Sequence, residues 1–226
     1  MPGYEVIHQR VAIAGVADLF IRSLLDRRQF ADPLGTALRL GISSAAWPLF
    51  GLLWPSGQQL AARLALHPVR VGERILEIGC GLALASLVGH RRGADMTASD
   101  GHPLAGVFLR ENLRLNGLPP MPYRHGRWSP DATDAATHDP ALDDPVEGRY
   151  DLIIGSDLLY ERDDAGALAS FIGRHVQPDA EVWVVDPNRG NRPAFNRRMV
   201  AQGYRIEDVP LAAPYRGRLL IYRRPG

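Results

Sequence analysis

The chain has 226 residues, of which 46% are apolar and 23% are charged, and its net charge is +1. This composition is typical of a globular protein, and the length allows one large domain or a domain with an accessory segment. No apolar run is long enough to span a bilayer, and the small net charge provides no field that would favour nucleic acid or a membrane surface.

The first residues and the cysteine content indicate the compartment. Asp18 interrupts the apolar stretch 11–21 and no basic region precedes it, so we expect no signal peptide. Cys80 is the only cysteine, which excludes a disulfide framework and fits a reducing compartment. We therefore expect a cytoplasmic protein.

Residues 1–53 are expected to form an accessory segment. Stretches 5–14 and 19–21 are rich in β-branched and apolar residues, which predicts two short strands or a hairpin. Residues 31–40 follow an Asp-Pro start and precede a glycine, which predicts a short helix. The apolar and aromatic stretch 45–54 is expected to cover one end of the core.

A strand, a glycine turn, a helix and a second strand follow one another between residues 74 and 100. The turn is Gly79-Cys80-Gly81, and the second strand ends on Asp100. This order is typical of the first βαβ unit of a doubly wound sheet that holds a nucleoside. The glycines let the backbone approach the ligand closely, and an acid about twenty residues later can accept hydrogen bonds from both ribose hydroxyls.

The remaining elements continue this α/β pattern. Ser56, with Gln59 three residues later, predicts a helix N-cap and a helix that ends near His67. The later expected elements are a helix at 103–115, a strand at 123–128, an acidic surface loop at 130–148, a strand at 150–156, a helix at 165–175, a strand at 181–185, a helix from 191 to about 203, and antiparallel strands at 204–209 and 219–223.

The glycine pattern distinguishes between nucleoside cofactors. A dinucleotide fold requires a third glycine at position 84, where this chain has Leu84. The pattern is instead acid-x-Gly-x-Gly-x-small, from Glu77 to Ala83. It resembles motif I of the seven-strand S-adenosylmethionine (SAM) methyltransferases, with Ala83 in place of the usual last glycine.

Further segments make the resemblance more specific. Leu53-Trp54-Pro55-Ser56-Gly57, the motif at 76–81, Asn112 to Asn116, Trp128, and Gly155-Ser156-Asp157-Leu158-Leu159-Tyr160-Glu161 occur in that order. The chain is therefore similar to the seven-strand protein-lysine methyltransferases, which carry an acid-x-x-aromatic motif after the fourth core strand. The resemblance implies a Rossmann-like α/β fold with a seven-stranded sheet in residues 54–226, and a small N-terminal β/α extension.

The resemblance also implies roles for individual residues. The SAM site would be lined by Trp54, Glu77, Gly79, Cys80, Gly81, Asp100, Trp128 and Ser156. Asp157 and Tyr160 would face the substrate amine, and no metal is required. One departure is Arg127, because the residue before the adenine-side tryptophan is often acidic in this family.

Three functions remain open on this basis. The first is methylation of a lysine side chain in a protein substrate. The second is methylation of a small-molecule amine or of RNA by the same fold, although the chain shows no basic stripe for RNA. The third is a SAM-binding module without catalysis, against which the presence of both Asp157 and Tyr160 argues.

Overall fold

The computed structural model describes residues 3–126, 128, 145–163 and 165–224. Arg127 and most of the predicted acidic loop 130–148 lie outside these residues. Within the described part of the chain, no helix is long and apolar enough to cross a membrane.

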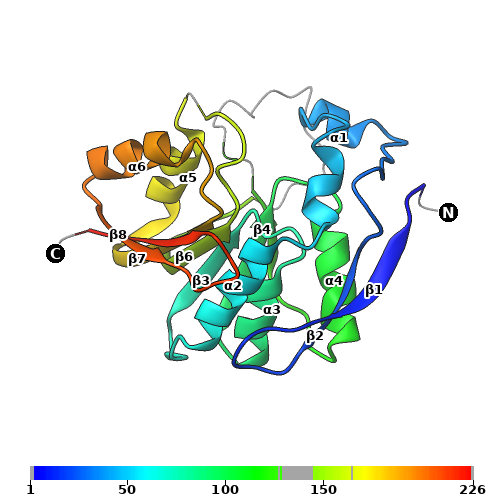
Figure 1. Cartoon of the computed structure of the whole chain (residues 1–226), viewed down its shortest axis with the longest axis horizontal. Coiled ribbons are helices and arrows are strands. Elements are labelled where there is room, and N and C mark those ends of the chain that lie inside the picture. Colours follow the sequence, from blue (N-terminus) through cyan, green and yellow to red (C-terminus); the bar gives the residue numbers. More distant parts are fainter. Residues whose placement is uncertain (1–2, 127, 129–144, 164, 225–226) are drawn as a thin grey trace.

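The centre of the fold is a seven-stranded sheet with the order β5-β4-β3-β6-β7-β9-β8 (Figure 1). Its strands are β3 (Arg74–Ile78), β4 (Asp95–Asp100), β5 (Tyr123–His125), β6 (Tyr150–Ser156), β7 (Val176–Asp186), β8 (Arg205–Pro210) and β9 (Arg218–Arg223). The first five run parallel, whereas β9 pairs antiparallel with both β7 and β8. This arrangement confirms the predicted Rossmann-like sheet and its antiparallel final pair.

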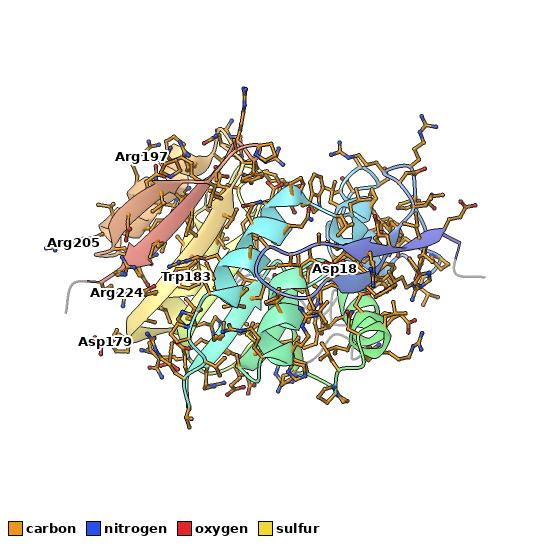
Figure 2. The ribbon with its side chains drawn as sticks, turned by 60° about the horizontal axis from the view of Figure 1, so that its bottom comes forward. Asp18, Asp179, Trp183, Arg197, Arg205 and Arg224 are labelled. Atoms are coloured by element: carbon orange, nitrogen blue, oxygen red, sulfur yellow. The ribbon has the colours of Figure 1, made fainter. Side chains whose placement is uncertain are left out.

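The helices are α1 (Thr36–Arg39), the 3-10 helix η1 (Trp47–Gly51), α2 (Pro55–Ala65), α3 (Leu84–Arg91), α4 (Ala105–Leu115), α5 (Ala167–His175) and α6 (Arg192–Ala201). The last five cover the two faces of the sheet. Alternate residues of one strand pack on opposite faces, as Ile75 and Leu76 of β3 do. One core joins α2, α3 and α4 to the sheet, and the other joins α5 and α6. Trp183 of β7, which is labelled in Figure 2, belongs to the first core. The Arg63 guanidinium lies 4.9 Å from its ring centroid.

The predicted N-terminal hairpin is present as β1 (Val6–Val11) and β2 (Leu19–Leu24), which pair antiparallel. Asn112 of α4 and Asn116, the C-cap residue of that helix, attach it to the core. The Phe20 N–H donates to Asn116 Oδ1 (2.9 Å), and Asn116 Nδ2 donates back to the Phe20 carbonyl (2.7 Å). Asn112 makes the same pair of contacts with Arg22, at 2.8 and 3.4 Å. The Asn112 to Asn116 segment thus serves to dock the hairpin.

Four predicted boundaries are wrong. The strand expected at 123–128 ends at His125. The helix expected at 31–40 is only Thr36–Arg39, because the Asp32 carboxylate accepts hydrogen bonds from the N–H groups of Ala37 and Leu38 and leaves the preceding residues in turns. Ser56 is not an N-cap: α2 begins at Pro55, a residue suited to the first helical position, with Trp54 as its N-cap.

The last error concerns residues 176–180. The strand is predicted to begin at residue 181, but these five residues already belong to β7, which begins at Val176. Val176 pairs with Tyr150, and the register then shifts before Leu152 pairs with Glu181. An irregularity of this kind accommodates Pro178, which has no N–H to donate to a regular ladder.

The sheet order fixes where a ligand can bind. The chain passes from β3 to β4 on one side and later returns to β6 on the other side of β3. Loops after β3 and β6 therefore leave the sheet in opposite directions and open a crevice at the carboxyl ends of the strands.

Candidate active site

The glycine turn after β3 forms one wall of this crevice. Gly79 and Gly81 have φ values of 56° and 52°, a region that strongly favours glycine. A Cβ at Gly81 would lie 2.9 Å from the backbone oxygen of Phe50, and one at Gly79 would lie 2.6 Å from Leu158 Cδ2. Ala83 also has a positive φ, 58°, which costs an alanine about 1 kcal/mol of backbone strain.

Glu77 lies beneath this turn and is almost fully buried. Its Oε2 accepts a hydrogen bond from the Ser86 backbone N–H at 2.7 Å, in the first turn of α3. Burial raises the pKa of Glu77 to about 7, although the bond from Ser86 opposes this and the Asp100 charge adds to it. Glu77 therefore connects the strand end to the helix start while its side chain borders the crevice.

Asp100 ends β4 and holds the turn from the other side. Its Oδ2 accepts from the Gly81 N–H (2.8 Å), and its Oδ1 accepts from the His102 N–H (2.8 Å). Burial raises the pKa of Asp100, and these backbone bonds partly oppose the rise. Each carboxylate oxygen has more than one lone pair and keeps acceptor capacity toward the crevice, as a ribose diol requires.

Aromatic groups flank this end of the crevice. His102 stacks on Phe50, with ring centroids 3.7 Å apart and planes 10° apart. Burial lowers the pKa of His102 to about 3, so its ring is neutral, and its Nδ1 accepts a hydrogen bond from the Leu104 N–H at 3.2 Å. Trp128 lies beside the glycine turn: its Cζ2 would be 3.7 Å from a Cβ at Gly79.

The segment between the hairpin and α2 lines another side of the crevice. Trp54 donates from Nε1 to the Leu49 carbonyl (2.9 Å), and the Arg27 guanidinium lies 5.1 Å from its ring centroid. Cys80 is buried opposite this segment, and burial raises the pKa of its thiol well above the ordinary value. The thiol therefore stays protonated at neutral pH and acts as a small wall residue.

The loop after β6 lines a further part of the crevice. Asp157 has a φ of 54°, and its N–H donates to the Val185 carbonyl at 2.8 Å. Its carboxylate accepts two hydrogen bonds from Arg189, from Nε to Oδ1 (2.7 Å) and from Nη2 to Oδ2 (2.9 Å). Tyr160 is half-exposed, and desolvation together with nearby carboxylates raises its pKa to about 12.

One cavity of about 590 Å³ joins these residues. It is lined by all of the residues expected from the sequence: Trp54, Glu77, Gly79, Cys80, Gly81, Asp100, Trp128, Ser156, Asp157 and Tyr160. The wall also contains Phe50, from the apolar stretch 45–54, and Arg27, His102 and Arg189, which the sequence did not indicate. For Arg189 a signal existed, because it follows the end of a core strand by three residues, at the rim where ligands bind.

Residues 57–222 match a protein-family model described as a methyltransferase domain. The chain therefore belongs to this family, and the predicted class, a SAM-dependent methyltransferase, is confirmed. The glycine turn and the acceptor capacity of Asp100 fit the adenosine part of that cofactor.

Two curated relatives match the chain over different lengths. The electron transfer flavoprotein beta subunit lysine methyltransferase of Mus musculus is 28% identical over 171 residues, which cover 74% of this chain and 60% of that protein. The protein N-lysine methyltransferase METTL21A of Danio rerio is 28% identical over 210 residues, covering 92% and 85%. The chain thus spans only about 60% of the length of the first relative.

A solved structure supports the fold. The T. Thermophilus 16S rRNA N2 G1207 methyltransferase (RsmC), in complex with AdoMet and guanosine, matches with a TM-score of 0.61 and 17% sequence identity. The match covers 97% of this chain and 51% of that one.

Proposed function

We propose that the protein transfers a methyl group from SAM to a lysine side chain of a protein substrate. The observation that carries this proposal is the convergence of Asp157 and Tyr160 with the glycine turn and Asp100 on one cavity. The two curated relatives described above are named as lysine methyltransferases, which supports a lysine as the acceptor.

The residues around the cavity have distinct roles in this proposal. Asp100 binds the ribose hydroxyls, and Trp128 contacts the adenine. Trp54, Glu77 and Ser156 border the amino-acid end, where the backbone of Gly79, Cys80 and Gly81 allows close approach. Residues 1–53 act as the accessory segment and 54–226 as the methyltransferase domain, with Phe50 and Arg27 contributed to the cavity by the first.

In this reaction the main role of the protein is to position its two substrates. When bound, SAM supplies a methyl group that leaves the sulfonium sulfur as the bond to the acceptor nitrogen forms. The acceptor must first lose a proton to water, because an ammonium has no lone pair. Asp157 accepts a hydrogen bond from the amine, and the Tyr160 ring and hydroxyl border it, so that the nitrogen is held at attacking distance.

Cofactor binding is tested by calorimetry with SAM and S-adenosylhomocysteine. We expect Asp100→Ala to weaken binding by about 1.5 to 3 kcal/mol, the cost of losing charge-assisted hydrogen bonds. Asp95→Ala is the matched control, because Asp95 is exposed at the opposite end of the same strand. Absence of SAM binding by the folded wild-type protein would overturn the proposal.

The acceptor is identified with tritiated SAM and a lysate. We expect the label in protein, on lysine residues that mass spectrometry then locates. Because the enzyme contains no lysine, labelled lysine side chains cannot come from methylation of the enzyme itself. Label on arginine, or label that passes a size filter with small molecules, would contradict a protein-lysine acceptor.

A further inference from the structure

The pairing of Asp157 with Arg189 bears directly on how an amine is received. Both carboxylate oxygens accept hydrogen bonds from the guanidinium, and only about 10% of the Asp157 side chain is exposed. Such a bidentate pair has a fixed geometry and is stronger than a single neutral hydrogen bond. Asp157 therefore does not present an isolated negative charge to the cavity.

The surrounding contacts hold Arg189 in place. Its backbone N–H donates to Oδ2 of the buried Asp186 at 3.0 Å. Two residues later, Asn191 Nδ2 donates to the carbonyls of Leu159 (3.0 Å) and Glu161 (2.9 Å). The loop after β7 is thus held to the end of its own strand at Arg189 and fastened to the loop after β6 at Asn191.

The ionisable groups around the Asp157 end of the cavity are mostly carboxyl groups. Asp157 and Glu161 come from the loop after β6, Asp186 from the end of β7, and Glu77 and Asp100 from the ends of β3 and β4. Tyr160 and Tyr215 lie near Asp157, and desolvation raises the pKa of each to about 12, so both are neutral. The positive charge of Arg192 opposes the rise in the pKa of Asp186 that burial causes. Arg27 lies in the segment between the hairpin and α2, where its guanidinium contacts the Trp54 ring.

We propose that Arg189 is a positioning residue that neutralises Asp157, so that the acceptor amine is held in its unprotonated, reactive form. The inference deepens the proposed function and rests on it. An unpaired carboxylate would stabilise an ammonium and oppose loss of its proton. In the ion pair, the carboxylate keeps lone pairs that accept an N–H from a neutral amine, while the guanidinium disfavours a second positive charge.

The first test needs only the cofactor and its product. SAM and S-adenosylhomocysteine differ by a methyl group and one positive charge, so the ratio of their dissociation constants reports the charge at the transfer site. We expect Arg189→Gln to increase the preference for SAM about tenfold, and Asp157→Asn to decrease it by a similar factor. The double variant should return to within about twofold of the wild-type ratio.

Calorimetry measures the ratio of the two dissociation constants for the wild type, Arg189→Gln, Asp157→Asn and the double variant. Equal ratios in all four would overturn the inference while leaving the proposed function intact, whereas wild-type protein that binds no SAM would overturn both. Arg218→Gln, which breaks the Arg218–Asp208 pair on the outer strands, is the matched control and should not change the ratio. If Arg189→Gln does not fold, Asp157→Asn alone still decides, because an unchanged ratio contradicts the inference.

The second test is the pH dependence of kcat, which reports groups in the enzyme–substrate complex. With the labelled acceptor, we expect the rise of kcat to move to higher pH in Arg189→Gln, with about tenfold lower activity at pH 7.5. Arg189→Lys should restore part of the shift, because it keeps the charge but not the bidentate geometry. A lower kcat with an unmoved pH profile would show a purely structural role.

Discussion

Replacing Glu77 by glutamine should change how stability depends on pH. Glu77 is 3% exposed, and its pKa is raised by burial from an ordinary value of 4.5 to about 7. Glutamine keeps the shape and an oxygen that can accept the Ser86 N–H, but it carries no charge. The substitution therefore removes the titration and preserves the hydrogen bond to α3.

The sign of the change in stability with pH follows from whether the folded or the unfolded state binds the Glu77 proton more tightly. Between pH 4.5 and about 7, the folded protein keeps the Glu77 proton while the unfolded chain releases it. The wild-type protein is therefore stabilised below pH 4.5 and loses that stability as the pH rises to about 7. The full effect is about 3 kcal/mol, and about 2 to 3 kcal/mol falls between pH 5 and pH 8.

Urea denaturation of wild-type protein and Glu77→Gln at pH 5 and pH 8 measures this difference. Subtracting the two pH dependences removes contributions from the histidines and other carboxylates. We expect the free energy of unfolding of the wild-type protein to fall by about 2 to 3 kcal/mol more than that of the variant. Equal pH dependences would show that Glu77 is ionised at its ordinary pKa in the folded protein, and the reasoning from burial would fail.

Two further substitutions test the hairpin and the glycine turn. Asn112→Ala should lower the free energy of unfolding by about 1 to 3 kcal/mol in urea denaturation, because the backbone N–H and carbonyl of Arg22 lose their partner; a change below about 0.5 kcal/mol would contradict this role. Gly81→Ala should weaken SAM binding about tenfold or more in calorimetry, since its Cβ would lie 2.9 Å from the Phe50 oxygen at a φ of 52°. Gly93→Ala, with a φ of 86° and open space around it, isolates backbone strain and should leave SAM affinity unchanged.

Much of the sheet could be predicted because its signals are local. The apolar run of β3, the glycine turn and the acid that ends β4 lie within 27 residues. The conformation of each can be predicted from the residues that form it. The same locality explains the errors at helix ends. Ser56 has the chemistry of an N-cap, but Pro55 before it already suits the first helical turn, and the packing of Trp54 decides where α2 starts.

The contacts of the site depend on residues that are distant in sequence. Parallel strands end at one edge, which is why Asp100 and Asp157 could be placed together from the sequence. The pairing of Asp157 with Arg189 joins residues 32 positions apart, and Asp157 has a positive φ; no local pattern specifies either feature. The Phe50 carbonyl against Gly81 likewise results from tertiary packing of the N-terminal segment.

Asn112 of α4 and its C-cap residue Asn116 hydrogen-bond to backbone groups along the edge of β2. Four residues of a helix rise about 6.0 Å and two residues of a strand about 6.8 Å, so the amides at positions 112 and 116 match the backbone groups of residues 22 and 20, respectively. A slip of the strand by one residue would turn those groups away from the amides, so the helix fixes the register of β2. It also occupies a strand edge that could otherwise pair with a neighbouring molecule, and so protects the protein against edge-to-edge aggregation.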